Sequence, residues 1–128
     1  MTPKKILLVD DSSTVLLLHR MMLSHCGYEL VTARDGQEAL DKAATARPDL
    51  IFLDVLMPRM DGFQACRALR ARDETRHVPI ILVTTRGEPH YVRQGFESGC
   101  TDYITKPFNG EALLAKVRGH LEERRSPP

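Results

Sequence analysis

The sequence lacks an excess of charge of either sign. Its 128 residues include 18 basic and 17 acidic side chains, for a formal net charge of +1, and the two signs are interspersed. A surface of this kind creates no long-range field that would attract nucleic acid or a membrane. The sequence also has no basic helix and no spare helix-turn-helix, so we expect no direct contact with nucleic acid.

Cysteine and long apolar runs are scarce as well. Cys26, Cys66 and Cys100 lie far apart and form no C-x-x-C pair, which fits reduced thiols better than a disulfide framework or a zinc site. The five histidines show no metal-ligand spacing, and we expect all of them at the surface or at its edge. The apolar stretch in MTPKKILLVDD is too short for a signal peptide or a membrane span, and no other run comes near the length of a membrane span. We therefore expect a cytoplasmic protein without a membrane partner.

What the sequence does contain is a regular alternation of short apolar segments and longer amphipathic ones. The apolar segments, predicted as strands, are 5–10, 29–33, 49–54, 79–85 and 101–105; the amphipathic segments, predicted as helices, are 13–26, 35–46, 62–72, 89–98 and 109–123. Such alternation favours a parallel sheet with helices on both faces, connected by right-handed crossovers. The sequence thus predicts one α/β domain, a three-layer doubly wound (βα)5 fold, over residues 1–123. Residues 124–128 would be a tail or the start of a linker.

The ends of the predicted strands carry the side chains with the most chemistry. They are Asp10 and Asp11 after the first strand, Asp54 after the third, Thr84 and Thr85 in the fourth, and Thr105, Lys106 and Pro107 after the fifth. In an open parallel sheet, ligands bind at the carboxyl ends of the strands, near the point where the strand order reverses. If the first and third strands are neighbours, three carboxylates converge at one edge.

This set of residues suits the transfer of a phosphoryl group. Three ionised carboxylates repel one another unless a hard cation such as Mg²⁺, which takes oxygen ligands, lies between them. Lys106 would add a positive charge and Thr84 a hydroxyl donor, and phosphoryl transfer depends mainly on positioning and charge neutralisation. Asp54 is the natural nucleophile, because we expect the turn that follows its apolar strand to leave it exposed.

Four segments carry a resemblance to a known family. They are ILLVDD at 6–11, LIFLDVLMPRMDG at 50–62, PIILVTT at 79–85 and GCTDYITKPF at 99–108. In this order and at these intervals they resemble the receiver domain of two-component response regulators, in particular a single-domain regulator of the chemotaxis type, over residues 4 to about 121. The resemblance implies a flavodoxin-like sheet of strand order 2-1-3-4-5.

The resemblance also implies a reaction. Asp54 would accept a phosphoryl group from the phosphohistidine of a histidine kinase or phosphotransfer protein. Mg²⁺ would be held by Asp10, Asp11, Asp54 and the backbone carbonyl of Leu56, and Lys106 would contact the phosphoryl oxygens. The chain would not be an enzyme with a separate substrate, since it would catalyse only its own phosphorylation and dephosphorylation.

A conformational switch is the second implication. Pro107 would follow a cis peptide bond, Thr84 would move to the phosphate, and Tyr103 would rotate into the space that is vacated. This change would alter the surface of the fourth helix, fifth strand and fifth helix, where a downstream protein would bind. We expect a monomer or a weak homodimer.

Three positions depart from the family pattern. Leu56 and Arg86 stand two residues after Asp54 and Thr84, at positions that in the family tune hydrolysis of the acyl phosphate. An apolar Leu56 cannot orient the attacking water, so we expect a long-lived phosphorylated state. Thr85 stands where the family usually has Ala or Gly, which would narrow access for small phosphate donors.

Leu16 and Leu17 are candidates for a partner surface. If Val15, Leu18 and Met22 face the sheet, these two leucines point away from it, close to Asp10. An exposed apolar pair beside a reactive site is typical of an interface. We expect it to dock a phosphotransfer helix of a kinase or a second subunit.

Other functions remain open at this point. A phosphatase of the haloacid dehalogenase type needs a second acid two residues after the nucleophile, where this sequence has Ser12 or Leu56. A flavin or nucleotide binder is suggested by Ser12-Ser13-Thr14, although no G-x-x-x-x-G-K-[ST] motif is present. A receiver that signals by binding alone is the third alternative.

Overall fold

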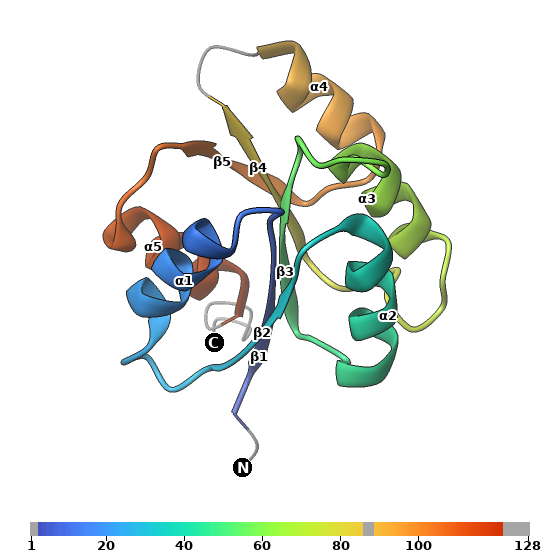
Figure 1. The fold of residues 1–128 in the computed structure, drawn as a ribbon. Helices are drawn as coiled ribbons and strands as arrows, with labels where there is room; N and C mark the ends of the chain where they lie inside the picture. Colours follow the sequence, from blue (N-terminus) through green and yellow to red (C-terminus); the bar gives the residue numbers. More distant parts are fainter. Residues whose placement is uncertain (1–2, 86–88, 122–128) are drawn as a thin grey trace, which may run out of the picture.

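The computed structural model describes residues 3–85 and 89–121, and in this range strands and helices alternate along the chain (Figure 1). The strands are β1 (Lys5–Val9), β2 (Glu29–Ala33), β3 (Leu50–Asp54), β4 (Ile80–Thr85) and β5 (Asp102–Lys106); the helices are α1 (Ser13–Leu23), α2 (Gly36–Ala46), α3 (Gly62–Arg70), α4 (Pro89–Glu97) and α5 (Gly110–Leu121). Neighbouring strands are parallel, and their order is β2-β1-β3-β4-β5. The predicted doubly wound fold and its strand order are therefore confirmed.

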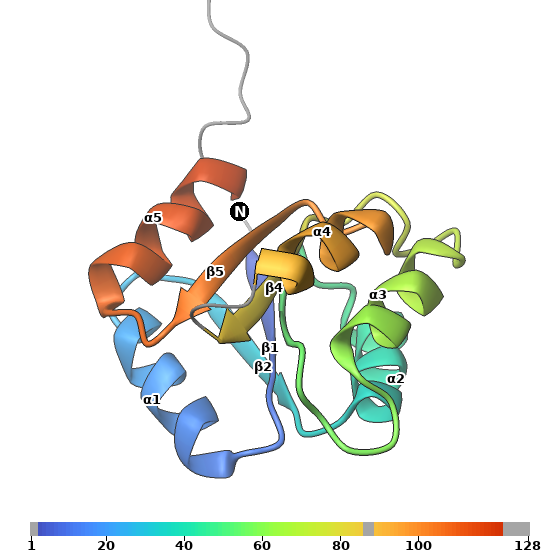
Figure 2. The same cartoon turned by 90° about the horizontal axis from the view of Figure 1, so that it is seen from above.

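The helices form a layer on each face of the sheet. Seen from above, α1 and α5 lie on one side, and α2, α3 and α4 on the other (Figure 2). Strand β3 is buried at every position because it is central and covered on both faces. Ile51 and Leu53 pack in the core beneath α2 and α3, whereas Leu50 and Phe52 pack beneath α1 and α5. A continuous apolar run, rather than an alternating one, is what such a strand requires.

Side-chain caps fix the starts of three helices. Ser12, Asp35 and Asp61 each accept a hydrogen bond from the backbone N–H three residues later, which satisfies a donor that the helix itself leaves unpaired. Asp61 and Gln64 form a full capping box. These starts agree with the predictions from sequence. The ends agree less well: α1 stops at Leu23, because the chain turns through Ser24 and reaches Gly27 at a positive φ of 82°.

The face that α1 presents to the sheet differs from the predicted one. Leu16, His19 and Leu23 are buried, whereas Leu17 and Leu18 are 58% and 51% exposed. The prediction that Leu16 points outward is therefore wrong, and so is the expectation that every histidine lies at the surface. The sequence STVLLLHRMML is apolar around most of the helix, so periodicity alone did not identify the buried stripe.

None of the helices in the described ranges combines the length and apolar character needed to cross a bilayer. The predicted tail at 124–128 and Arg86 lie outside the described residues.

Candidate functional site

The carboxyl ends of β1 and β3 bring three acids together. Val9 of β1 pairs with Leu53 of β3, so Asp10 and Asp54, each one residue further along the chain, lie beside each other at the carboxyl ends of these two strands. Carboxylate oxygens of Asp10, Asp11 and Asp54 all lie within 4.8 Å of one another. Asp10 and Asp54 are buried, and Asp11 is exposed.

Lys106 reaches this cluster from β5. The register of β4 and β5 pairs Thr84 with Thr105 and Thr85 with Lys106. The Lys106 ammonium lies 3.0 Å from Asp10 Oδ2 and 3.3 Å from Asp54 Oδ1. Burial alone would lower the pKa of Lys106, but the hydrogen bond to Asp10 and the nearby carboxylate charges outweigh it and raise the pKa. The ammonium is therefore a permanent positive charge between two acids.

At Asp54, burial outweighs the nearby Lys106 charge and disfavours the ionised form. Its side chain is only 9% exposed, which corrects the expectation that the turn after β3 leaves it open. Burial is the main cause that raises its pKa from 3.8 to about 6, and the charge of Asp10 adds to it, while Lys106 opposes the shift. Near neutral pH the metal-free carboxylate is thus close to its titration point, and any added cation favours the ionised form.

Close backbone packing leaves Asp54 little freedom to move. Gly62, at the start of α3, donates its N–H to Val55 O at 2.9 Å. A Cβ at this glycine would lie 2.8 Å from Val55 Cα and would collide with the backbone oxygen of Asp54. A glycine is needed here because any side chain would push the reactive strand end away from α3.

The donor set fits a hard divalent cation. Three carboxylates offer the oxygen ligands that Mg²⁺ prefers, and one of them is exposed, which leaves a route for water ligands and a phosphate. The Leu56 side chain is 56% exposed beside the cluster. The role of its backbone carbonyl as a ligand stays a prediction.

The remaining predicted residues lie around this cluster in different settings. Thr84 is buried and Thr85 exposed, Tyr103 is half-buried, and the Lys106–Pro107 peptide bond is cis. Leu16 packs in the core and does not contribute to the surface that Leu17 helps to form.

Two features outside the acid cluster were missed in the sequence. The buried His19 lies against Phe108, just after the Lys106–Pro107 bond, with ring centroids 4.9 Å apart. Asp102, at the start of β5, binds two side chains of α5. Neither has a local spacing signal, because both contacts join segments far apart in the chain.

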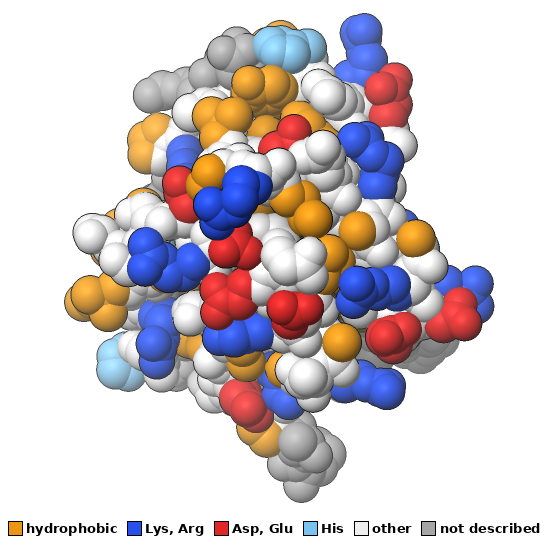
Figure 3. Space-filling model, turned by 45° about the vertical axis from the view of Figure 1, so that its right-hand side comes forward, with side chains coloured by type: hydrophobic (Ala, Val, Ile, Leu, Met, Phe, Trp, Pro, Cys, Tyr) orange, Lys and Arg blue, Asp and Glu red, His pale blue; other side chains and the backbone are white. Residues whose placement is uncertain are grey.

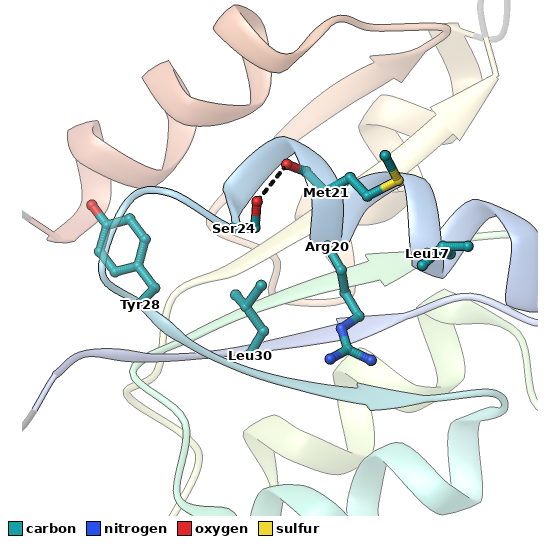
Figure 4. Close-up of a pocket in the computed structure, with 6 residues that line it drawn as sticks. All are labelled: Leu17, Arg20, Met21, Ser24, Tyr28 and Leu30. Atoms are coloured by element: carbon teal, nitrogen blue, oxygen red, sulfur yellow. Dashed lines mark hydrogen bonds between the residues drawn. The ribbon is translucent and has the colours of Figure 1, made fainter.

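The face drawn in Figure 3 carries both signs of charge, with acidic and basic side chains close together rather than in separate large patches. A separate groove of about 460 Å³ lies between α1 and β2 and is lined by Leu17, Arg20, Met21, Ser24, Tyr28 and Leu30 (Figure 4). None of the clustered acids lines this groove, so it is not the reactive site.

Comparison with known proteins gives one consistent result. Residues 6–118 match the family described as the response regulator receiver domain. The chain is 43% identical over 118 residues to the alkaline phosphatase synthesis transcriptional regulatory protein PhoP of Bacillus subtilis, which covers 92% of this chain and 48% of PhoP. It is 39% identical over 117 residues to the DNA-binding dual master transcriptional regulator RpaA of Synechocystis, covering 91% of this chain and 48% of RpaA.

A solved structure of similar size agrees. The chemotaxis response regulator CheY4 of Vibrio cholerae has a TM-score of 0.88 and 41% sequence identity, over 94% of this chain and 100% of that one. Both curated relatives described above are named as transcriptional regulators. The chain spans about half of their length.

These relatives correct the prediction about partners. The expectation that nucleic acid is not a partner is wrong as a conclusion from this sequence, because RpaA is named a DNA-binding regulator and PhoP a transcriptional one. The reasoning failed because a receiver region with balanced charge says nothing about DNA contacts made by other parts of a regulator.

The raised pKa of Asp54 predicts a pH-dependent cost in stability. Because its pKa is about 6 in the folded protein and 3.8 ordinarily, the folded state favours the protonated acid. The contribution of Asp54 to the free energy of unfolding is therefore most favourable below about pH 4, and it is lost as the pH rises through about 6. In EDTA at pH 7, we expect Asp54→Asn to raise the free energy of unfolding by about 1–3 kcal/mol.

Urea denaturation at several pH values checks this prediction. The gain in the free energy of unfolding of Asp54→Asn should become smaller below pH 5. The control variant Asp73→Asn, at an exposed position, should show no such gain. A gain that does not change between pH 4 and pH 7 would contradict the assigned cause.

Proposed function

The chain belongs to the response regulator receiver domain family, and we propose that Asp54 is its phosphoacceptor. Asp54 would receive the phosphoryl group from the phosphohistidine of a histidine kinase or phosphotransfer protein in the cytoplasm. The observation that carries this proposal is the cluster of three carboxylates within 4.8 Å, with Lys106 bound to two of them. We assign this function to a receiver unit over residues 1–123.

The reaction needs Asp54 as an anion. An Asp54 carboxylate oxygen attacks phosphorus, the bond from phosphorus to the donor imidazole breaks, and the imidazole leaves as the neutral base after it takes up a proton. Asp10, Asp11, Asp54 and the Leu56 carbonyl would hold Mg²⁺, which when bound neutralises charge on the phosphoryl oxygens. Lys106 donates hydrogen bonds to the same oxygens. Its ammonium lies 3.3 Å from the attacking carboxylate, so a small movement transfers its contact from acid to phosphate.

The new phosphoryl group would be read through Thr84 and Tyr103. Thr84 is buried one residue before the end of β4, where its hydroxyl can turn toward the phosphate. Tyr103 lies on β5, next to β4, and would rotate into the vacated space. The phosphoryl group then favours one of two arrangements of the α4–β5–α5 surface, to which a downstream protein would bind.

Phosphorylation of Asp54 is directly measurable. With Mg²⁺ and acetyl phosphate, the intact mass should increase by about 80 Da, the mass of one phosphoryl group. The increase should be lost in EDTA and in Asp54→Asn. Because Thr85 narrows access for small donors, the phosphorylated kinase is the second donor to use. No mass increase with either donor, in folded protein with Mg²⁺ bound, would contradict the proposal and leave a module that signals by binding alone.

The lifetime of the phosphorylated state depends on Leu56 in this proposal. Its exposed, apolar side chain cannot hydrogen-bond a water molecule that attacks the acyl phosphate. We expect Leu56→Gln to shorten the lifetime severalfold, measured by loss of the mass increase after donor removal. Thr45→Gln, at an exposed position on α2, should leave the lifetime unchanged. A longer lifetime in Leu56→Gln would show that this position acts in another way.

The docking surface for the phosphate donor is proposed on α1, in a form corrected by the structure. Leu17, Leu18 and Met21, called here the α1 apolar patch, are 58%, 51% and 62% exposed. The patch is one or two turns from the carboxylates, so a donor helix packed on it would bring its phosphohistidine to Asp54. Exposed apolar side chains of this size are costly in water unless a partner covers them.

A charge in the α1 apolar patch should block docking but not chemistry. For Leu17→Glu we expect roughly a ten-fold slower phosphotransfer from a kinase or phosphotransfer protein that phosphorylates the wild type. The rate with acetyl phosphate should not change, and Thr45→Glu on the exposed side of α2 is the matched control. Equal kinase rates for Leu17→Glu and the wild type would exclude the patch as the docking surface.

A further inference from the structure

Asp102 connects β5 to α5 through one carboxylate. Its Oδ1 accepts the backbone N–H of Tyr103 at 2.7 Å, and its Oδ2 lies 2.9 Å from Lys116 Nζ and 3.0 Å from His120 Nε2. The side chains of Asp102 and Lys116 are 24% and 35% exposed. This site lies at the start of β5, whereas Lys106 occupies its end.

The ionised form of Asp102 is favoured in this setting. Burial alone would raise its pKa, but the hydrogen bonds from His120 and Lys116 outweigh it and lower the pKa. The carboxylate is therefore a stable anchor for the Lys116 ammonium near neutral pH.

The anchored ammonium lies over the ring of Tyr103. Lys116 Nζ is 5.8 Å from the ring centroid, within the range of a cation–π contact. From α4, Phe96 meets the same ring edge to face, with centroids 6.2 Å apart and an interplanar angle of 89°. Tyr103 is thus contacted by a helix on each side of β5. The contact from α5 is charged and held in place by Asp102.

We propose that Lys116 is a positioning residue for Tyr103: held by Asp102, it stabilises the present position of the ring and thereby sets how much phosphoryl binding is needed to move it. This inference rests on the proposed function, in which Tyr103 rotates when Asp54 is phosphorylated. A ring that turns toward β4 loses the ammonium, while Asp102 and His120 keep their own contact. Lys116 therefore stabilises one arrangement more than the other, which is the condition for shifting a two-state equilibrium.

Lys116 fits this role better than Phe96. Phe96 is 49% exposed and its ring stands perpendicular to that of Tyr103, so it has room to follow the ring or to move into solvent. Lys116 is fixed by an ion pair, which reduces the entropy lost when the ammonium is placed over the ring. The size of a partly exposed cation–π contact predicts a shift of about two- to five-fold in the switching equilibrium.

The test monitors the environment of the Tyr103 ring by ¹⁹F NMR. The chain has three tyrosines and no tryptophan, so 3-fluorotyrosine labelling gives three ¹⁹F signals, and Tyr103→Phe assigns the one of interest. Beryllofluoride with Mg²⁺, which binds carboxylates as a phosphoryl analogue, is the titrant. The variants are Lys116→Gln, Lys116→Arg as the conservative change, and Arg93→Gln, which removes one positive charge from an exposed position on α4.

We expect Lys116→Gln to lower the beryllofluoride concentration at half-saturation by about two- to five-fold. Without the titrant, its Tyr103 signal should already be shifted toward the saturated position. Lys116→Arg and Arg93→Gln should behave as the wild type, and thermal unfolding checks that all variants are folded.

Three results would overturn the proposal. Lys116→Gln titrating as the wild type would show that the ammonium does not restrain the ring. Lys116→Arg titrating as Lys116→Gln would show that a cation at this position is not the cause. If the wild-type Tyr103 signal does not change at saturating beryllofluoride, Tyr103 does not move in response to the analogue and the proposed switch is wrong. A mass increase on Asp54 would still support the phosphoacceptor role in that case.

Discussion

The site depends on one electrostatic conflict, the burial of two carboxylates beside a third at the end of a parallel sheet. Asp10 and Asp54 are almost fully buried and share Lys106 as their only ion-pair partner among the described residues. Burial, with the charge of Asp10 added to it, outweighs the single Lys106 ammonium, so the pKa of Asp54 stays raised to about 6. A divalent cation bound between the acids would offset part of their charge, so the ionisation of Asp54 depends on what is bound beside it.

The fold creates this conflict and also stabilises it. Strands β1 and β3 are adjacent although α1, β2 and α2 separate them in sequence. The acids at their ends are therefore brought together by two crossovers, with α1 on one face of the sheet and α2 on the other (Figure 2). Both cores pack against β3, and Gly62 brings α3 against the backbone of Asp54 and Val55. The energy that keeps the acids together comes from apolar burial along the strands, not from the site itself.

Strand β5 connects the reactive end of the sheet with an outer surface. Lys106 at its end contacts the acids, while Tyr103 and Asp102 near its start contact α4 and α5. In the proposed switch, a change of charge at Asp54 would act on a strand whose other end has its own ion pairs. In this arrangement a local electrostatic event can alter a surface without movement of the whole domain.

The sequence by itself determined the parts that local rules govern. Apolar runs indicated buried strands. The predicted starts of the first three helices lie within one residue of the observed ones, because a cap such as Ser12, Asp35 or Asp61 and its donor lie within three residues of each other. Strand-end positions, with the resemblance, were enough to select Asp10, Asp11, Asp54 and Lys106. Only the tertiary structure decided which face of α1 is buried, how deeply Asp54 lies, and that Asp102 anchors Lys116 over Tyr103. The physical reason is that burial and ion pairing depend on neighbours far apart in the chain, such as Asp102 and His120, 18 residues apart, and no local pattern encodes them.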